Sequence, residues 1–217
     1  MLTCQQLIQG SSIHWKNYIE HHFVLQLAQG TLPIINFQHY LKQDYLYLFH
    51  YSRAFGLAVY KADTFAQMSA AQQVVQSILE ESELHISYCK EWGISKEELQ
   101  QLSEAPACIA YTRYVLDCGM HGTLAELYAA IAPCALGYAE IARMINERRL
   151  SPSNNPYQKW IDSYASPDFQ HSAAQIGATL EQLCQFITPS QLQKIQEIFT
   201  TATRMEVAFW QMGLDLN

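Results

Sequence analysis

The sequence has few charged residues and none of the motifs that identify most enzyme classes. Charged residues make up 15% of its 217 residues, against roughly 25% in typical soluble domains. It contains no glycine-rich phosphate loop, no H-E-x-x-H and no G-x-S-x-G, which argues against P-loop nucleotide hydrolysis, zinc proteolysis and the serine hydrolases. The net charge is −7, and the only adjacent pair of basic residues that stands out is Arg148-Arg149. Nucleic acid and anionic membranes are therefore not expected as partners.

The cysteines and the apolar segments also lack organisation. The six cysteines are scattered without a C-x-x-C pair, so we expect reduced thiols rather than disulfides or a zinc knuckle. No apolar run reaches the roughly 18 residues of a membrane span, and the start MLTCQQLIQG has neither the charged beginning nor the apolar core of a signal peptide. These absences predict a cytoplasmic protein without a membrane segment.

What the sequence has in abundance is apolar and aromatic side chains. Hydrophobic residues make up 49% of the chain and aromatic residues 12%. With so little charge, part of this apolar surface has to be covered, and symmetric self-association is the usual solution. The composition therefore predicts a homo-oligomer.

The apolar residues recur at helical spacing throughout, and no strand pattern, internal repeat or low-complexity tract is present. Start and stop signals predict an all-α fold of eight to ten helices in a single domain, residues 1–217. Asn36 is expected to cap the second helix. The expected helices cover about 2–28, 36–62, 65–92, a short segment that Ser95 caps, a segment from Pro106 to about 119, 123–150, 157–164, a segment that Ser166-Pro167 opens, and 190–212, which a capping box of Thr188 and Gln191 opens.

Cys134 lies in the most apolar of these helices. Thr123 and Glu126 form a capping-box pattern that starts this helix. Pro133 lacks an N–H group for the preceding turn and predicts a kink around 129–133, and Gly137 is expected to loosen the following turn. Backbone polar groups near a kink are imperfectly paired, which favours Cys134 as a nucleophile among the six cysteines. The alternative is a buried structural thiol, the commoner role of a free cysteine.

Two carboxylates lie on aromatic helix faces. Asp44, Tyr47 and Tyr51 follow one another at i, i+3 and i+7, so a carboxylate falls within an aromatic stripe. A buried carboxylate is costly unless it is paired. Glu206 precedes Phe209 and Trp210 at i+3 and i+4, and such surroundings predict a pKa raised toward neutrality, as a proton-transfer group requires. The alternative is a glutamate whose carboxylate reaches solvent at the rim of its helix.

A metal centre is a competing interpretation. Glu81 and His85 stand one helical turn apart, and helical bundles can hold a di-iron site between such residues. The usual pattern is a Glu-x-x-His repeated on two helices. Here only Glu140, Asp168 and His171 are available to complete a set, and the spacing does not repeat, which favours a solvated acidic face.

The remaining combination is a cysteine, two carboxylates and many tyrosines. A flat heteroaromatic ligand can stack between such rings while a carboxylate accepts its N–H groups. The cysteine can then attack an electron-poor carbon, and the second carboxylate can move protons.

Five segments together resemble the thiaminase II (TenA) family. They are QDYLYL around residue 44, AYTRY around 111, APCALGYAEI around 134, NPYQKWIDSYAS around 160, and MEVAFW around 206. Their order and separations cover nearly the whole chain, so the set is specific although each piece alone is weak. The resemblance implies a haem-oxygenase-like helical bundle and a homotetramer. It also implies hydrolysis of 4-amino-2-methylpyrimidines at the substituent on C5, with thiamine or aminomethylpyrimidine as substrate.

The resemblance also assigns roles to residues of this chain. Cys134 matches the family's nucleophile, Glu206 its proton-transfer glutamate and Asp44 its pyrimidine-binding aspartate. Neither a metal nor a cofactor is implied. Ala135 and Leu136 stand where a bulkier aromatic residue can follow the Pro-Cys pair in the family, so the choice between substrates is left open. The implied pocket residues are Tyr47, Tyr111, Tyr138, Tyr164 and Phe209.

Three classes of function therefore remain: a cysteine-dependent pyrimidine hydrolase, a di-iron or other metal-dependent oxidase on the same fold, and a non-catalytic ligand-binding regulator. One fold can host all three. Metal content separates the first two, and product identification separates the hydrolase from the regulator.

Overall fold

The computed structural model describes residues 2–217, except for the side chains of Glu81, Glu83 and Leu84. Within this part of the chain there are eleven helices and no strand, so the predicted all-α class is correct and the predicted number of helices is slightly low. The helices are α1 (Cys4–Gly10), α2 (Ser12–Ile19), α3 (His22–Ala28), α4 (Ile34–Lys61), α5 (Phe65–Glu91), α6 (Lys96–Gln100), α7 (Pro106–His121), α8 (Leu124–Glu147), α9 (Gln158–Ala165), α10 (Pro167–Leu183) and α11 (Pro189–Asp215).

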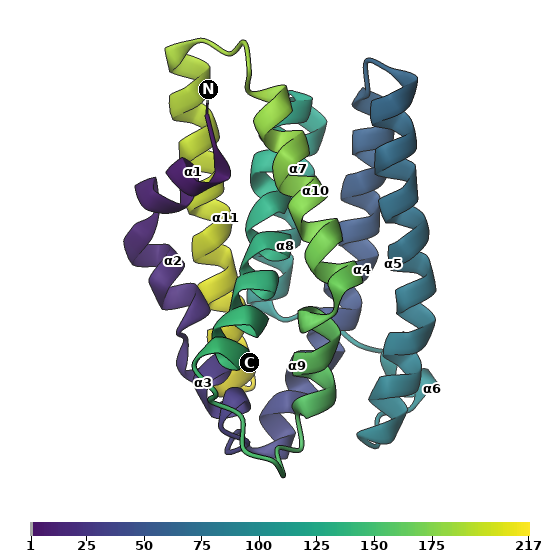
Figure 1. The fold of residues 1–217 in the computed structure, drawn as a ribbon. Helices are drawn as coiled ribbons and strands as arrows, with labels where there is room; N and C mark the ends of the chain where they lie inside the picture. Colours follow the sequence, from purple (N-terminus) through teal and green to yellow (C-terminus); the bar gives the residue numbers. More distant parts are fainter. Residues whose placement is uncertain (1) are drawn as a thin grey trace.

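Helix α8 is the central element of the bundle. It packs against α2, α4, α7, α9, α10 and α11, and the longer helices run along a common axis around it (Figure 1). By length and composition alone α8 could cross a membrane, but 72% of its most apolar window is buried inside the bundle. Its hydropathy is therefore accounted for by its place in the core. The helix continues through Pro133 without interruption.

The predicted first helix, 2–28, is wrong in its continuity, because the segment forms three short helices. The side chain of Gln196 lies at the first break, where its Nε2 donates to the carbonyl of Leu7 (3.1 Å) and to Ser11 Oγ (2.9 Å). These bonds attach the first break to α11, on which Gln196 lies. The second break is at His21, whose Nδ1 accepts the N–H of Phe23 (3.2 Å) and caps α3.

Asn36 does not cap α4, contrary to the prediction. The cap position is Pro33, and the Asn36 side chain instead donates to the carbonyls of Gly213 and Leu214 (2.8 Å each) at the end of α11. The last carbonyls of a helix have no partner within it, so Asn36 fastens the C-terminal end of α11 to the start of α4.

The other predicted start residues cap their helices, although the pattern at Thr123 and Glu126 forms only the bond to the Thr123 hydroxyl and not the reciprocal one. The Thr123 hydroxyl accepts the N–H of Glu126 (3.2 Å) at the start of α8, and Ser95 accepts that of Glu98 (3.0 Å) at the start of α6. Thr188 and Gln191 form a reciprocal capping box at the start of α11. Each hydroxyl satisfies an N–H group that its helix leaves free.

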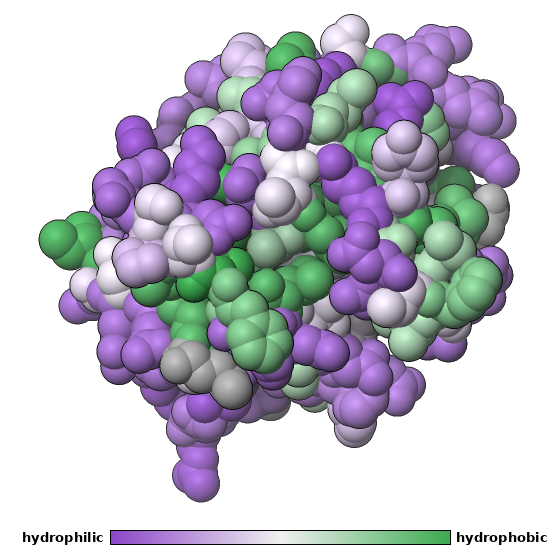
Figure 2. Space-filling model, turned by 90° about the horizontal axis from the view of Figure 1, so that it is seen from above, coloured by the Kyte–Doolittle hydropathy of each residue, from purple (hydrophilic) through white to green (hydrophobic). Residues whose placement is uncertain are grey.

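Several large apolar side chains lie on the surface. In the end view of the bundle, hydrophobic groups emerge between hydrophilic ones (Figure 2). Exposed side chains of this kind include Ile13, Tyr60, Phe65, Met120 and Phe186, of which Phe186 is the most exposed at 96%.

Candidate active site

The residues predicted for the site come from five helices and meet in the interior of the bundle. Helix α4 contributes Asp44 and Tyr47, α7 contributes Tyr111, α8 contributes Cys134 and Tyr138, α9 contributes Tyr164, and α11 contributes Glu206 and Phe209. All are buried except Cys134 and Tyr164, which are partly exposed. The structure therefore brings together side chains up to 165 positions apart, counted from Asp44 to Phe209.

Glu206 is a buried carboxyl, with only 2% of the residue exposed. It accepts the Tyr111 hydroxyl hydrogen at 2.7 Å. Burial raises the pKa of Glu206 to about 8, and the nearby charge of Asp44 acts in the same direction. The solvent-exposed alternative is therefore wrong. A carboxyl whose pKa lies near neutral pH can both donate and accept a proton under ordinary conditions.

Cys134 lies beside Glu206 and is more accessible than its neighbours. Removal from bulk water, and then the charge of Glu206, raise the pKa of the Cys134 thiol well above its ordinary value. The hydroxyl of Tyr47 acts in the opposite direction. A thiol in this position is protonated in the resting protein.

Asp44 faces His85, a residue that the sequence analysis considered only as a metal ligand or as part of a solvated acidic face. His85 Nε2 lies 3.0 Å from the carbonyl oxygen of Leu41, which can only accept, so this nitrogen carries a proton. His85 Nδ1 consequently faces Asp44 Oδ2 at 3.9 Å. Burial raises the pKa of Asp44 to about 6, while His85 and the Tyr40 hydroxyl oppose that rise. Asp44 is thus ionised at neutral pH although it is buried.

Aromatic rings enclose the three polar groups from several directions. Tyr47 packs against Tyr111 (5.0 Å between ring centroids) and Phe209 (5.7 Å). On the other side, Tyr138 packs against Tyr164 (4.8 Å) and Trp210 (5.3 Å). Offset and edge contacts at such distances build rigid apolar walls. The arrangement suits a flat aromatic ligand that also carries hydrogen-bonding groups.

Four donors within these walls have no hydrogen-bond partner in the described part of the chain: the hydroxyls of Tyr18, Tyr47 and Tyr51 and the indole N–H of Trp210. Buried polar groups without partners are rare and costly, and here they gather around Cys134 and Glu206. A polar ligand would satisfy such a group, so their clustering makes this the candidate binding site.

Three of these four residues were missed as site residues. Tyr51 belonged to the predicted aromatic stripe, and Trp210 to the apolar face of Glu206, but neither pattern distinguishes a pocket wall from core packing. Tyr18 lies in α2, far from the rest in sequence. The sequence signal that could have pointed to Tyr18 was Gly137, one turn after Cys134. A glycine inside a helix can mark a place where another side chain packs closely against the backbone.

The residues considered for a metal centre do not assemble. No three His, Cys, Asp or Glu side chains approach one another closely enough, as far as the described side chains extend. His85 faces Asp44, and Glu140 accepts the indole N–H of Trp15 (3.1 Å). Asp168 and His171 are exposed on α10. The side chain of Glu81 lies outside the described residues.

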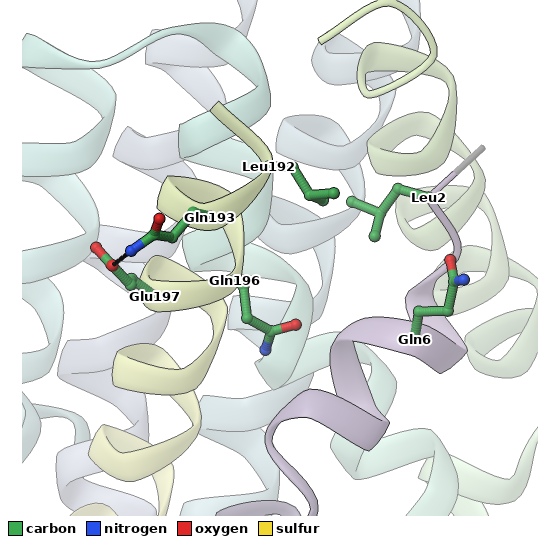
Figure 3. A pocket seen from close by; sticks show the side chains of 6 residues that line it. All are labelled: Leu2, Gln6, Leu192, Gln193, Gln196 and Glu197. Carbon is green, nitrogen blue, oxygen red and sulfur yellow. Dashed lines mark hydrogen bonds between the residues drawn. The ribbon is translucent and has the colours of Figure 1, made fainter. Parts of the chain in front are cut away.

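A surface pocket of about 500 Å³ lies away from this site, between the N-terminal segment and the start of α11. Figure 3 shows its lining, which consists of Leu2, Gln6, Leu192, Gln193, Gln196 and Glu197. Gln193 donates to Glu197 (2.9 Å) and Gln196 to Leu7 and Ser11. With these amide donors already paired, the pocket offers no chemistry comparable to the interior site.

Comparison with known proteins identifies the family. The chain matches the TENA/THI-4/PQQC family over residues 10–216 and belongs to it. A protein of Haemophilus influenzae without an assigned function is 60% identical over 98% of this chain and 99% of its own length. The aminopyrimidine aminohydrolase of Halalkalibacterium halodurans is 34% identical over 92% of this chain and 89% of its own length.

Solved structures confirm the predicted fold. A TenA family transcription regulator from a Silicibacter species superimposes with a TM-score of 0.92 at 39% identity, covering 97% of this chain and 95% of that one. A domain of unknown function with a heme oxygenase-like fold from Shewanella denitrificans superimposes with a TM-score of 0.75 at 14% identity, covering 100% and 94%. At that identity the second likeness shows the fold alone.

Proposed function

We propose that this member of the TENA/THI-4/PQQC family hydrolyses 4-amino-2-methylpyrimidines substituted at C5, with Cys134 as nucleophile. The observation that supports this most directly is the adjacency of Cys134 and Glu206 inside an aromatic enclosure. The relative named aminopyrimidine aminohydrolase supports the same class of reaction. The substrates we propose are aminomethylpyrimidine and thiamine.

Asp44 is the group proposed to recognise the pyrimidine. Its carboxylate is buried and ionised at neutral pH, and it accepts the N–H groups of the 4-amino substituent. The rings of Tyr47, Tyr138 and Phe209 then enclose the pyrimidine plane. Buried, charge-assisted hydrogen bonds of this kind contribute more than neutral ones.

The proposed reaction begins when ionised Glu206 takes the thiol proton of Cys134. The thiolate forms a bond to an electron-poor ring carbon, and the displaced ring electrons expel the substituent from the C5 methylene. When the leaving group is an amine, Glu206 donates its proton to it; a thiazolium leaves as neutral thiazole and takes no proton, and in that case Glu206 releases its proton to solvent. Water then adds to the methylene carbon and returns a proton to Glu206, and departure of the thiolate restores the ring. The net change is replacement of the amine or thiazolium by hydroxyl.

The experiment that tests this function is incubation of the purified protein with aminomethylpyrimidine and, separately, with thiamine. Liquid chromatography with mass detection should find hydroxymethylpyrimidine in one or both reactions. Binding of these compounds without product formation would favour the regulator instead. Stoichiometric iron that is lost on His85→Ala or Glu81→Ala would favour the oxidase.

We also propose a homotetramer located in the cytoplasm. The exposed side chains of Tyr60, Phe65 and Phe186 are apolar surface that an oligomer interface would cover. The six cysteines are free thiols, which suits a reducing compartment. A monomer mass in light scattering at micromolar concentration would contradict the tetramer.

A further inference from the structure

Tyr18 is completely buried against the helix that carries Cys134. Its ring lies over Gly137, where a Cβ atom would stand 2.6 Å from both Tyr18 Cζ and the hydroxyl oxygen. Real side chains do not approach so closely, so only glycine at position 137 admits the ring. The contact places the phenol end of Tyr18 one turn along α8 from the thiol.

The Tyr18 ring is held on two further sides. Trp15 meets it edge-on at 5.7 Å, and Trp210 stacks on it at 6.3 Å. The hydroxyl, in contrast, forms no hydrogen bond of normal geometry among the described residues. Packing alone would favour a phenylalanine here, because a buried hydroxyl without a partner is destabilising. The hydroxyl therefore needs an explanation beyond the core.

We propose that Tyr18 is a positioning residue for Glu206, and that its hydroxyl donates a second hydrogen bond to the ionised carboxylate beside the one from Tyr111. This role rests on the proposed function, in which Glu206 carries the proton. The hydroxyl lies near Glu206, whose negative charge is the foremost charge effect on the pKa of Tyr18 and raises it. The Tyr18 hydroxyl in turn lowers the pKa of Glu206, because it lies close enough to act as a hydrogen-bond donor to the carboxylate although the two groups do not meet in normal hydrogen-bond geometry.

The charge state of Glu206 decides how many hydrogen bonds its carboxyl can accept. With a pKa of about 8, the carboxyl carries a proton at neutral pH and already accepts Tyr111. A protonated carboxyl has less acceptor capacity than a carboxylate. When Glu206 ionises, an acceptor position becomes available, and Tyr18 is placed to fill it.

Other titratable groups also influence Glu206, and the test has to leave them unchanged. They come from three helices besides α2, and they are Asp44, Tyr47 and Tyr51 on α4, Tyr111 on α7, and Cys134 and Tyr138 on α8. Tyr18→Phe removes one hydroxyl and keeps the ring contacts. Its matched control is Tyr88→Phe, which removes another buried hydroxyl without a partner, on α5, among Phe37 and Trp92.

The test titrates the Glu206 carboxyl by carbon-13 NMR, with Glu206→Gln to assign the signal, in wild type, Tyr18→Phe and Tyr88→Phe. We expect Tyr18→Phe to raise the pKa of Glu206 by about one unit, equivalent to a tenfold change in its ionisation constant. Tyr88→Phe should leave it unchanged. An equal pKa in all three proteins would overturn the proposal.

Kinetics provide the second readout. For Tyr18→Phe we expect kcat at pH 7 to fall about tenfold with KM within twofold, and the pH–rate limb to move to higher pH. A purely structural role would instead alter the melting temperature and leave the limb in place. If wild type turns over neither pyrimidine, the proposed function fails, while the NMR titration still decides the role of Tyr18.

Discussion

His85 presents Nδ1 to Asp44 Oδ2 at 3.9 Å while its Nε2 donates to the Leu41 carbonyl at 3.0 Å. The second bond fixes which nitrogen can face the carboxylate, since a carbonyl never donates. A protonated His85 is therefore an ion-pair partner for Asp44, and a neutral one presents a lone pair to it. The charge state of Asp44, the proposed pyrimidine-binding group, thus depends on His85.

We expect His85→Ala to weaken pyrimidine binding. Without His85 the pKa of Asp44 should rise above about 6, so less of the carboxylate remains to accept the amino group. KM at pH 7 should increase about tenfold, on the scale of a lost charge-assisted hydrogen bond. Asp44→Ala removes the carboxylate altogether and should therefore give the largest increase in KM. The control is His121→Ala, because His121 pairs with Asp117 on the surface (2.9 Å). Equal KM values for both histidine variants would contradict the role of His85.

Cys134→Ser should abolish turnover and leave the fold intact. Serine is nearly isosteric with cysteine but is a far weaker nucleophile at neutral pH. The loss of kcat should be three orders of magnitude or more, roughly the effect of removing a covalent nucleophile. Circular dichroism reports on the fold, and Cys118→Ser, on the neighbouring helix α7, is the matched control. Activity of Cys134→Ser within a few-fold of wild type would remove this thiol from the mechanism.

The pH–rate profile should rise with pH to a plateau above about 8. Ionised Glu206 is the proposed base for the thiol, and burial raises the pKa of Glu206 to about 8. Glu206→Gln should lower kcat about a hundredfold or more, the usual scale of general acid–base catalysis, and remove this limb. Glu197→Gln changes an exposed residue on the same helix and should behave as wild type. If the limb persists in Glu206→Gln, another group transfers the proton.

Glu206 should also make folding stability depend on pH. Its pKa is higher in the folded protein, about 8, than the ordinary value of 4.5, so its contribution is fully present below pH 4.5 and is lost as pH rises through 8. Glu206→Gln removes this dependence. Between pH 5 and 8, the free energy of unfolding of wild type should therefore decrease relative to the variant by up to about 3 kcal/mol. Urea denaturation of both proteins at these two pH values measures the difference, and parallel changes would argue that Glu206 is not protonated in the folded state.

The sequence was informative about local structure and about residue types. Thr123, Ser95 and Thr188 start their helices where predicted, because capping depends on neighbours only a few positions away. The Asn36 prediction failed for the complementary reason: its partners, Gly213 and Leu214, belong to a helix at the other end of the chain. A side chain suited to capping can serve any helix end that comes near.

The same distinction applies to the site. Asp44 and Glu206 drew attention as carboxylates on apolar faces, and both prove to be buried. Periodicity could not predict that they face Cys134 together, since the three residues lie on separate helices. The interpretation of His85 is wrong: the sequence pattern favours a solvated acidic face over a metal ligand, whereas the packing of α5 on α4 brings His85 to Asp44.

The central position of α8 has a consequence for synthesis on the ribosome. Three of the helices that cover it, α9, α10 and α11, follow it in the chain. When α8 has just left the ribosome, the nascent chain therefore exposes an apolar helix whose hydropathy is that of a membrane span. At that stage α11 has not been synthesised and cannot cover it. We expect such chains to be chaperone clients until the last helix emerges, and fragments that stop before Pro189 to aggregate rather than fold.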